Sequence, residues 1–147
     1  MKIVLQRVNN AKVEVENKIV GRIQKGIILF LGISKNYTED KLDWMINKIL
    51  NLRIWPDEND KGFQKSILDI QGEILVISQF TLYGDCSRGT KPKFNGSCEY
   101  EKAEEVYDLF IEKLREKSKL KIESGTFGGM MKINSENDGP VTLIIEK

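Results

Sequence analysis

The sequence contains no histidine, and this absence excludes more chemistry than any other feature of its composition. Without an imidazole the chain cannot build a Ser-His or Cys-His nucleophile pair, and it lacks the usual general base at neutral pH. Most common zinc sites are excluded as well, and we expect neither a metal nor another cofactor. Any chemistry must therefore rely on positioning, on backbone dipoles or on groups that the substrate brings.

Cysteines and long apolar runs are also scarce. Cys86 and Cys98 stand twelve positions apart, outside any C-x-x-C spacing, and we expect both to be reduced thiols. No apolar run approaches the ~20 residues of a membrane span, and the start at Met1 lacks the architecture of a signal peptide. We therefore expect a cytoplasmic protein without a membrane partner.

Net charge is nearly absent, because 23 basic residues face 22 acidic ones and leave a formal charge of +1. A protein that coats nucleic acid needs a clear basic excess, so we expect no DNA partner, and any RNA contact must be local. The best candidates for such a contact are Arg88, Lys91 and Lys93 in one predicted loop. A run of loop cations is, however, more often only a solvated surface.

The 147 residues are enough for one domain, over residues 1–147, with a single core. The N-terminal third has the alternating and β-branched pattern of strands, at residues 3–8, 11–15, 19–23 and 27–31, with a hairpin turn at 16–18. Four strands in succession predict an antiparallel meander. Further strands are predicted at residues 67–70, 74–77, 121–124, 131–135 and 141–145, and a polar loop at 56–60.

Two helices are predicted from apolar residues at helical spacing. The first is capped by Thr38, and its apolar face consists of Leu42, Met45, Ile46, Ile49 and Leu50. The second is capped by Ser97, and its stripe consists of Tyr100, Ala103, Val106, Tyr107, Phe110 and Leu114. Two helices do not cover a sheet of this size on both faces, so we expect an α+β fold with a mostly antiparallel sheet that closes toward a β-barrel.

Two short segments carry the strongest functional signal. Ser78-Gln79-Phe80-Thr81-Leu82 follows the continuous apolar run 74–77, which is typical of a strand buried on both faces, so its polar groups emerge at a sheet edge or pocket rim. The second segment, residues 137–142, holds the step Gly139-Pro140. Proline has no backbone donor and glycine reaches unusual dihedrals, so this step can turn carbonyl oxygens toward a ligand. Alone, each segment is more often a strand end or a surface turn.

Together, in this order and at this spacing, the two segments resemble those of the D-aminoacyl-tRNA deacylases, which remove D-amino acids from tRNA. Beyond them, the resemblance is carried by Leu5-Gln6-Arg7-Val8, Arg88-Gly89, Pro92, Thr126-Phe127 and Met131. It implies a homodimer that hydrolyses the ester of D-aminoacyl-tRNA and of mischarged glycyl-tRNA, and that rejects the L-aminoacyl ester. The implied partner is the acceptor end of the tRNA with its terminal adenosine.

The resemblance also implies the site residues. The catalytic segment is Ser78, Gln79, Phe80 and Thr81, and the substrate-binding residues are Gly139, Pro140, Arg7, Phe127 and Met131. In the family the Gly-Pro peptide bond is cis and enters the active site of the partner subunit, where its carbonyls hold the substrate ammonium and leave no room for an L side chain. Arg7 is implied to brace that step. Residues 127–131 would otherwise be a tight turn between core residues.

The backbone N–H groups of Phe80 and Thr81 are candidates for stabilising the oxyanion of the tetrahedral intermediate. The Thr81 hydroxyl is a weak nucleophile without a base, so we expect a noncovalent role, with the tRNA 2′-hydroxyl orienting or activating water. Two alternatives stay open. A noncatalytic RNA-binding module would bind without turnover, and a hydrolase with a threonine nucleophile would form an acyl-threonine.

Overall fold

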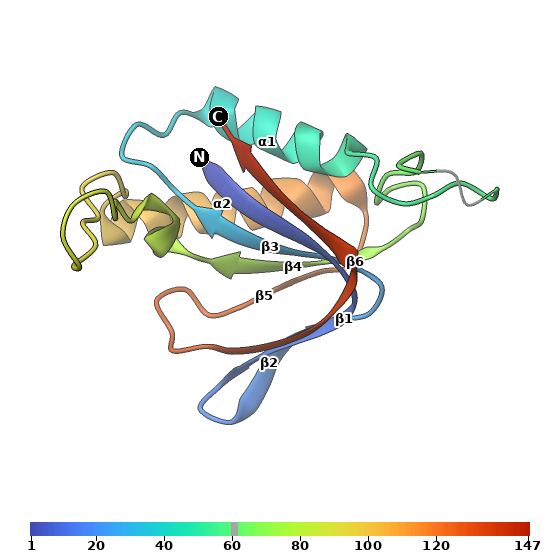
Figure 1. Cartoon of the computed structure of the whole chain (residues 1–147), viewed down its shortest axis with the longest axis horizontal. Coiled ribbons are helices and arrows are strands. Elements are labelled where there is room, and N and C mark those ends of the chain that lie inside the picture. Colours follow the sequence, from blue (N-terminus) through green and yellow to red (C-terminus); the bar gives the residue numbers. More distant parts are fainter. Residues whose placement is uncertain (60–61) are drawn as a thin grey trace.

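The computed structural model of the chain describes residues 1–59 and 62–147, and within them it contains a curved sheet and two α-helices (Figure 1). The strands are β1 (Lys2–Val15), β2 (Lys18–Ile23), β3 (Gly26–Gly32), β4 (Glu73–Ser78), β5 (Ile122–Ser124) and β6 (Lys132–Glu146). The helices are α1 (Glu39–Asn51), α2 (Tyr100–Ser118) and the short 3-10 helix η1 (Phe80–Tyr83). The sheet curves into a nearly closed, barrel-like shape, as the sequence predicted.

Strands β3 and β4 separate two apolar clusters. Ile27 and Leu29 of β3 belong to the larger cluster, which also contains the apolar faces of both helices, whereas Ile28 belongs to the smaller cluster inside the curved sheet. In β4, Val76 belongs to the larger cluster and Ile77 to the smaller one. Both faces of these two strands are therefore covered, which explains their continuous apolar runs and is expected from the sequence for residues 74–77.

The predicted meander is wrong, because the first two predicted strands are one strand. Strand β1 continues through residues 9 and 10 and pairs antiparallel with β2, β3 and β6. Strands β3 and β4 are parallel, and so are β4 and β5. The long β1 pairs with β3 through its first half and with β2 through its second half, which lets one strand span both ends of the curved sheet.

The last two predicted strands are also one strand, β6, which lies along β1 in Figure 1. Its ladder is interrupted where Gln6 pairs with Thr142 and Val8 pairs with Asn137. Four residues of β6, 138–141, thus stand opposite the single residue Arg7. A proline cannot donate to the ladder, so the surplus residues form a bulge. The bulge carries the Gly139-Pro140 step, whose peptide bond is cis.

Thr38 occupies the N-cap position of helix α1, as predicted, but its side chain makes no capping hydrogen bond. Helix α2 begins after Glu99, so the prediction that Ser97 caps it is wrong. The Ser97 hydroxyl instead donates a hydrogen bond of 3.2 Å to the carbonyl of Phe80. No helix in the described part of the chain is long and apolar enough to cross a membrane.

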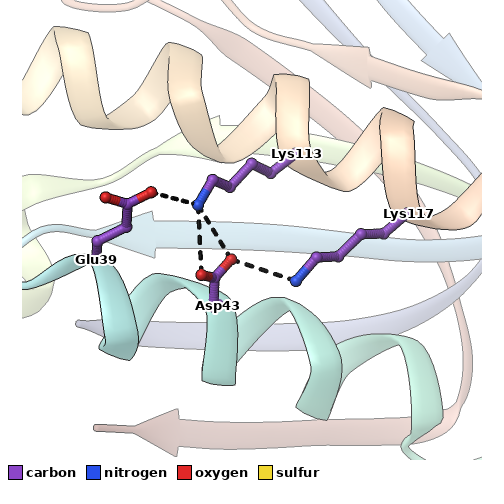
Figure 2. Close-up of polar contacts among 4 residues, drawn as sticks. All are labelled: Glu39, Asp43, Lys113 and Lys117. Atoms are coloured by element: carbon purple, nitrogen blue, oxygen red, sulfur yellow. Dashed lines mark hydrogen bonds and ion pairs between the residues drawn. The ribbon is translucent and has the colours of Figure 1, made fainter.

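Ion pairs join the exposed sides of the two helices (Figure 2). The Lys113 ammonium lies 2.6 Å from a Glu39 carboxylate oxygen and 3.2 Å from Asp43, and Lys117 lies 3.2 Å from Asp43. The charges of these two lysines of α2 are thus compensated by carboxylates of α1.

The predicted strand at 67–70 is wrong, since these residues form a turn. Ser66 donates from its backbone N–H and its hydroxyl to Asp69, both at 2.7 Å, and these bonds compete with strand pairing. Ile67 is still fully buried, so its apolar character reflects core packing of a turn. Of the predicted loop at 56–60, residue 60 lies outside the described residues.

Candidate active site

A largely apolar pocket of about 550 Å³ opens where β4 ends. Ser78 is the last residue of β4, Gln79 follows it, and η1 begins at Phe80. The Gln79 N–H donates a 2.8 Å hydrogen bond to the Leu31 carbonyl, which fixes the turn against the end of β3. The pocket is lined by Leu31, Ile33, Ile77, Ser78, Gln79, Phe80, Cys98, Tyr100, Ala103, Phe127, Gly128, Gly129, Met130, Met131 and Ile133. Five of the predicted site residues, from two distant segments, thus share one cavity.

Aromatic rings build the wall opposite η1. The ring of Phe127 packs edge-to-face on Tyr100 at 5.2 Å and lies 5.5 Å from Tyr107. The Tyr107 hydroxyl donates a 2.8 Å hydrogen bond to the Val76 carbonyl, and burial raises the pKa of this phenol well above its usual range. Tyr107 therefore remains neutral at physiological pH and supports the wall of the pocket.

Gly128 is required at its position for two reasons. Its φ of +67° is in the left-handed region, and a Cβ there would lie only 2.3 Å from the Tyr100 hydroxyl. The segment that carries Phe127 can therefore approach the start of α2 closely enough to close the pocket.

Thr81 lies beside the pocket lining, on the exposed side of η1. Its hydroxyl accepts a hydrogen bond from the Gln79 side-chain amide. An amide NH₂ group is a donor and cannot take up the hydroxyl proton. The contact therefore orients the Thr81 hydroxyl without activating it as a nucleophile.

Backbone donors are available at the start of η1. The Gln79 carbonyl accepts from the Leu82 N–H at 3.3 Å, which closes the first turn of the 3-10 helix. The N–H groups of Phe80 and Thr81 precede that bond, and the hydrogen bonds found among the described residues do not include them. The first N–H groups of a helix have no intrahelical acceptor. The Phe80 side chain is 59% exposed, so this turn is open to an incoming ligand.

The remaining predicted residues lie outside this pocket. The Arg7 guanidinium is mostly buried and contacts Asp138, with Nε 3.0 Å from Oδ2 and 3.3 Å from the backbone oxygen, and it also donates to the Ile54 carbonyl. Gly139 and Pro140 are exposed. Gly139 has a φ of +130°, and a Cβ there would meet the Val141 nitrogen at 2.8 Å. Arg7 thus packs against the bulge, but one chain alone does not bring the bulge into the pocket.

Sequence reasoning missed several pocket residues. Tyr100 lines the pocket although its spacing assigns it to the apolar stripe of α2, and it is 61% exposed. Cys98 also lines it. An aromatic residue at the first position of an amphipathic helix is the only sequence signal, and it does not distinguish a pocket from a core. In the described ranges, no group of three or more thiol and carboxylate side chains is placed to hold a metal ion.

The chain is similar to one known family over almost its whole length. Residues 4–146 match the model of the family described as D-Tyr-tRNA(Tyr) deacylase. A protein of Thermosipho melanesiensis named D-aminoacyl-tRNA deacylase is 51% identical over 146 residues, which are 99% of this chain and 97% of that protein. A protein of the same name from Picosynechococcus is 52% identical over 147 residues, which are 100% of this chain and 97% of that protein.

Two solved structures are also similar. One, described as "c-Myc DNA Unwinding Element Binding Protein", has a TM-score of 0.94 and 44% identity, and the match covers 100% of this chain and 99% of that one. The other is described as a probable eukaryotic D-amino acid tRNA deacylase and has a TM-score of 0.86 over 98% of this chain and 97% of that one. At 18% identity the second likeness concerns the fold alone.

Proposed function

Because the chain belongs to the D-Tyr-tRNA(Tyr) deacylase family and is a hydrolase of that class, we propose that it frees D-amino acids from tRNA at the pocket beside η1. The observation that carries this proposal is the cavity at the end of β4, where Ser78, Gln79 and Phe80 meet the Phe127–Met131 segment. The cavity receives the aminoacyl group and the terminal adenosine. We propose the cytoplasm as the place of action, and residues 1–147 as one functional domain.

The reaction needs only modest help from the protein, because an aminoacyl ester is already activated. Water adds to the carbonyl carbon, the bond to the ribose oxygen breaks, the ribose regains its hydroxyl and the amino acid leaves as a carboxylate with release of a proton. The N–H groups of Phe80 and Thr81 stabilise the oxyanion, and one such donor contributes about 10²–10³ in rate. The neighbouring 2′-hydroxyl of the tRNA orients the water. Thr81 positions the turn and forms no covalent intermediate.

Selection against L-amino acids requires a group that contacts the substituents of the substrate Cα and distinguishes their D from their L arrangement. We assign this role to the carbonyl oxygens of Gly139 and Pro140, which hold the substrate ammonium. Both residues are exposed and lie outside the pocket of their own chain, which supports a dimer in which each subunit supplies this step to the other. Strand β6 favours the same arrangement, since its described ladder partner is β1 and its other edge is open to a second copy.

Two other functions, DNA binding and noncatalytic RNA binding, fit the chain less well. One of the similar structures belongs to a protein named for binding DNA, but a net charge of +1 does not favour binding along a DNA duplex. A noncatalytic RNA-binding module would leave the donors of η1 without a use. The proposed function is therefore hydrolysis of D-aminoacyl-tRNA, and we propose no DNA partner.

One assay tests the activity and the handedness together. The purified protein is incubated with matched D-tyrosyl-tRNA and L-tyrosyl-tRNA, and loss of the ester is followed over time. We expect rapid hydrolysis of the D ester and none of the L ester above the uncatalysed rate. Equal rates on both esters would reject the proposed selection, and no hydrolysis of either would reject the activity. An excess of duplex DNA added as a competitor should leave the rate on the D ester unchanged.

A further inference from the structure

The loop that follows η1 extends away from the sheet (Figure 1), and its base contacts Phe80 of the pocket lining. Asp85 and Lys93 exchange two backbone hydrogen bonds of 2.7 and 3.0 Å, which close the loop. The ring of Phe94 packs edge-to-face on Phe80 at 5.1 Å, and the Ser97 hydroxyl donates to the Phe80 carbonyl. These contacts hold the base of the loop against η1.

The loop concentrates positive charge in a chain that has almost none overall. Residues 84–98 contain the cations Arg88, Lys91 and Lys93 and a single acid, Asp85. Their net charge is therefore +2, whereas the net charge of the whole chain is only +1. All three cations are exposed, and none of the ion pairs in the described part of the chain involves them. Glu99, the next charged residue along the chain, ends the basic stretch.

The lysines of Figure 2 are a useful contrast. Lys113 and Lys117 are held by Glu39 and Asp43, so their charge is compensated within the protein. The loop cations have no such carboxylate partner among residues 1–59 and 62–147, and their charge is free to act on a ligand. Because Phe94 at the base of this loop contacts Phe80 of the pocket lining, the uncompensated cations of the loop attract an anion that continues beyond the pocket.

We propose that Arg88, Lys91 and Lys93 bind the phosphodiester backbone of the tRNA acceptor end while its terminal aminoacyl-adenosine occupies the pocket. This inference rests on the proposed function and adds the surface that recognises the remainder of the substrate. The pocket of about 550 Å³ takes only the terminal residue and its ester, so the following phosphates lie outside it. The loop makes a local, sequence-independent contact, which a chain without a general basic excess can still provide.

The test compares a long and a short substrate. D-tyrosyl-tRNA carries the phosphates, whereas 2′(3′)-O-D-tyrosyladenosine carries the same ester without them. The variant is Arg88→Ala with Lys91→Ala and Lys93→Ala, and the control is Lys18→Ala with Arg22→Ala and Lys25→Ala, which removes three exposed cations from β2 and the turn after it. We expect kcat/KM on the tRNA to fall roughly ten- to a hundredfold in the loop variant, mainly through KM. Activity on the adenosine ester should be unchanged, and the control should match the wild type on both.

Salt dependence gives a second readout that needs no turnover. Binding of uncharged tRNA is measured by fluorescence anisotropy over a range of salt concentrations. Loss of three phosphate contacts lowers the slope of log K against log salt by about 2 to 3. Equal slopes and affinities for the loop variant and the wild type would overturn the inference, whatever the turnover. An equal loss on both esters would also overturn it, because the loop would then act on the pocket itself. If the wild type hydrolyses neither ester, the proposed function fails, and the binding slopes still decide the role of the loop.

Discussion

The guanidinium of Arg7 lies 3.0 Å from the carboxylate of Asp138, so a residue in the middle of β1 holds the bulge of β6 in place. The same side chain donates to the Ile54 carbonyl, in the segment that follows α1. Arg7 thereby connects three parts of the chain around the Gly139-Pro140 step.

We expect Arg7→Lys to impair the enzyme although it preserves the charge. A lysine ammonium cannot reproduce the planar fork that contacts Asp138 and the Ile54 carbonyl together. The free energy of unfolding should fall by about 1–3 kcal/mol, and kcat/KM on D-tyrosyl-tRNA should fall at least about tenfold. Denaturant titration and the deacylation assay measure the two effects. Lys12→Arg, at the half-buried Lys12–Glu14 pair of the same strand, is the matched control and should change neither quantity. Unchanged kinetics in Arg7→Lys would contradict the role of Arg7 in bracing the Gly139-Pro140 bulge.

Thr81→Ala should keep most of its activity. The partner of the Thr81 hydroxyl is the Gln79 amide, a donor, so the hydroxyl has no base to activate it. We expect kcat to fall by less than about tenfold, because general positioning effects are smaller than the loss of a nucleophile. Single-turnover kinetics on D-tyrosyl-tRNA measure the change. Complete loss of hydrolysis with tRNA binding and folding intact would restore the covalent mechanism.

Glycyl-tRNA should be a substrate. A pocket that selects by rejecting L side chains has no means to reject glycine, which has no side chain to clash. We expect its hydrolysis at enzyme concentrations where L-alanyl-tRNA remains intact, and ester loss from both substrates is followed side by side. Inertness toward glycyl-tRNA, with D-tyrosyl-tRNA cleaved, would instead mean that the pocket contacts the D side chain.

Mixing two inactive variants tests whether the site is shared between subunits. One variant carries Gly139→Ala and Pro140→Ala, and the other carries Phe80→Trp and Thr81→Trp to fill its own pocket. After random exchange of an equal mixture, half of the dimers are mixed and each has one intact site of two, so about a quarter of the wild-type activity should return. Mass spectrometry confirms the exchange. Mixed dimers without activity would place each site within one chain.

The ion pairs of Figure 2 predict how stability depends on pH. The Lys113 and Lys117 ammonium groups lower the pKa of Asp43 below its usual value, with hydrogen bonds from Lys113 as the largest cause. A carboxylate with a lowered folded-state pKa stabilises the protein above its unfolded pKa of about 3.9, and this stabilisation is lost as the pH falls through the folded value. Asp43→Asn should therefore be less stable than the wild type at pH 7 and equally stable at low pH. Thermal melts at pH 7 and pH 2.5 measure the difference. A constant difference at both pH values would contradict this origin.

Patterns in the sequence predict elements correctly wherever the local chemistry and the tertiary contacts agree. The helix after Thr38 and the doubly covered run 74–77 have the predicted structure because their apolar residues repeat at the right spacing. The strand prediction at 67–70 depends on apolar residues such as Ile67. The hydrogen bonds between Ser66 and Asp69 instead fix this segment as a turn. The hydroxyl of Ser97 is predicted to cap its own helix, but its partner is seventeen residues away in sequence.

The site is predictable in its parts but not in its arrangement. Residues 78–80 and 127–131 are both predicted from their sequence, and the pocket unites them, yet neither segment contains a signal for the other. Tyr100 escapes prediction because a pocket wall and a core have the same apolar pattern. The bulge opposite Arg7 depends on a register shift between strands from the two ends of the chain, which no local pattern encodes.

The pairing of β1 with β6 has a kinetic consequence. Its register joins Lys2 to Glu146 and Val8 to Asn137, so these contacts close loops that contain most of the chain. Closing such a loop costs entropy before the pairing compensates for it, and folds that depend on distant pairings form slowly. A chain still emerging from the ribosome can assemble β1, β2 and β3 early, but it cannot seat the Gly139-Pro140 bulge on Arg7 until β6 has been made. Selectivity for the D ester would therefore be among the last properties that the folding enzyme acquires.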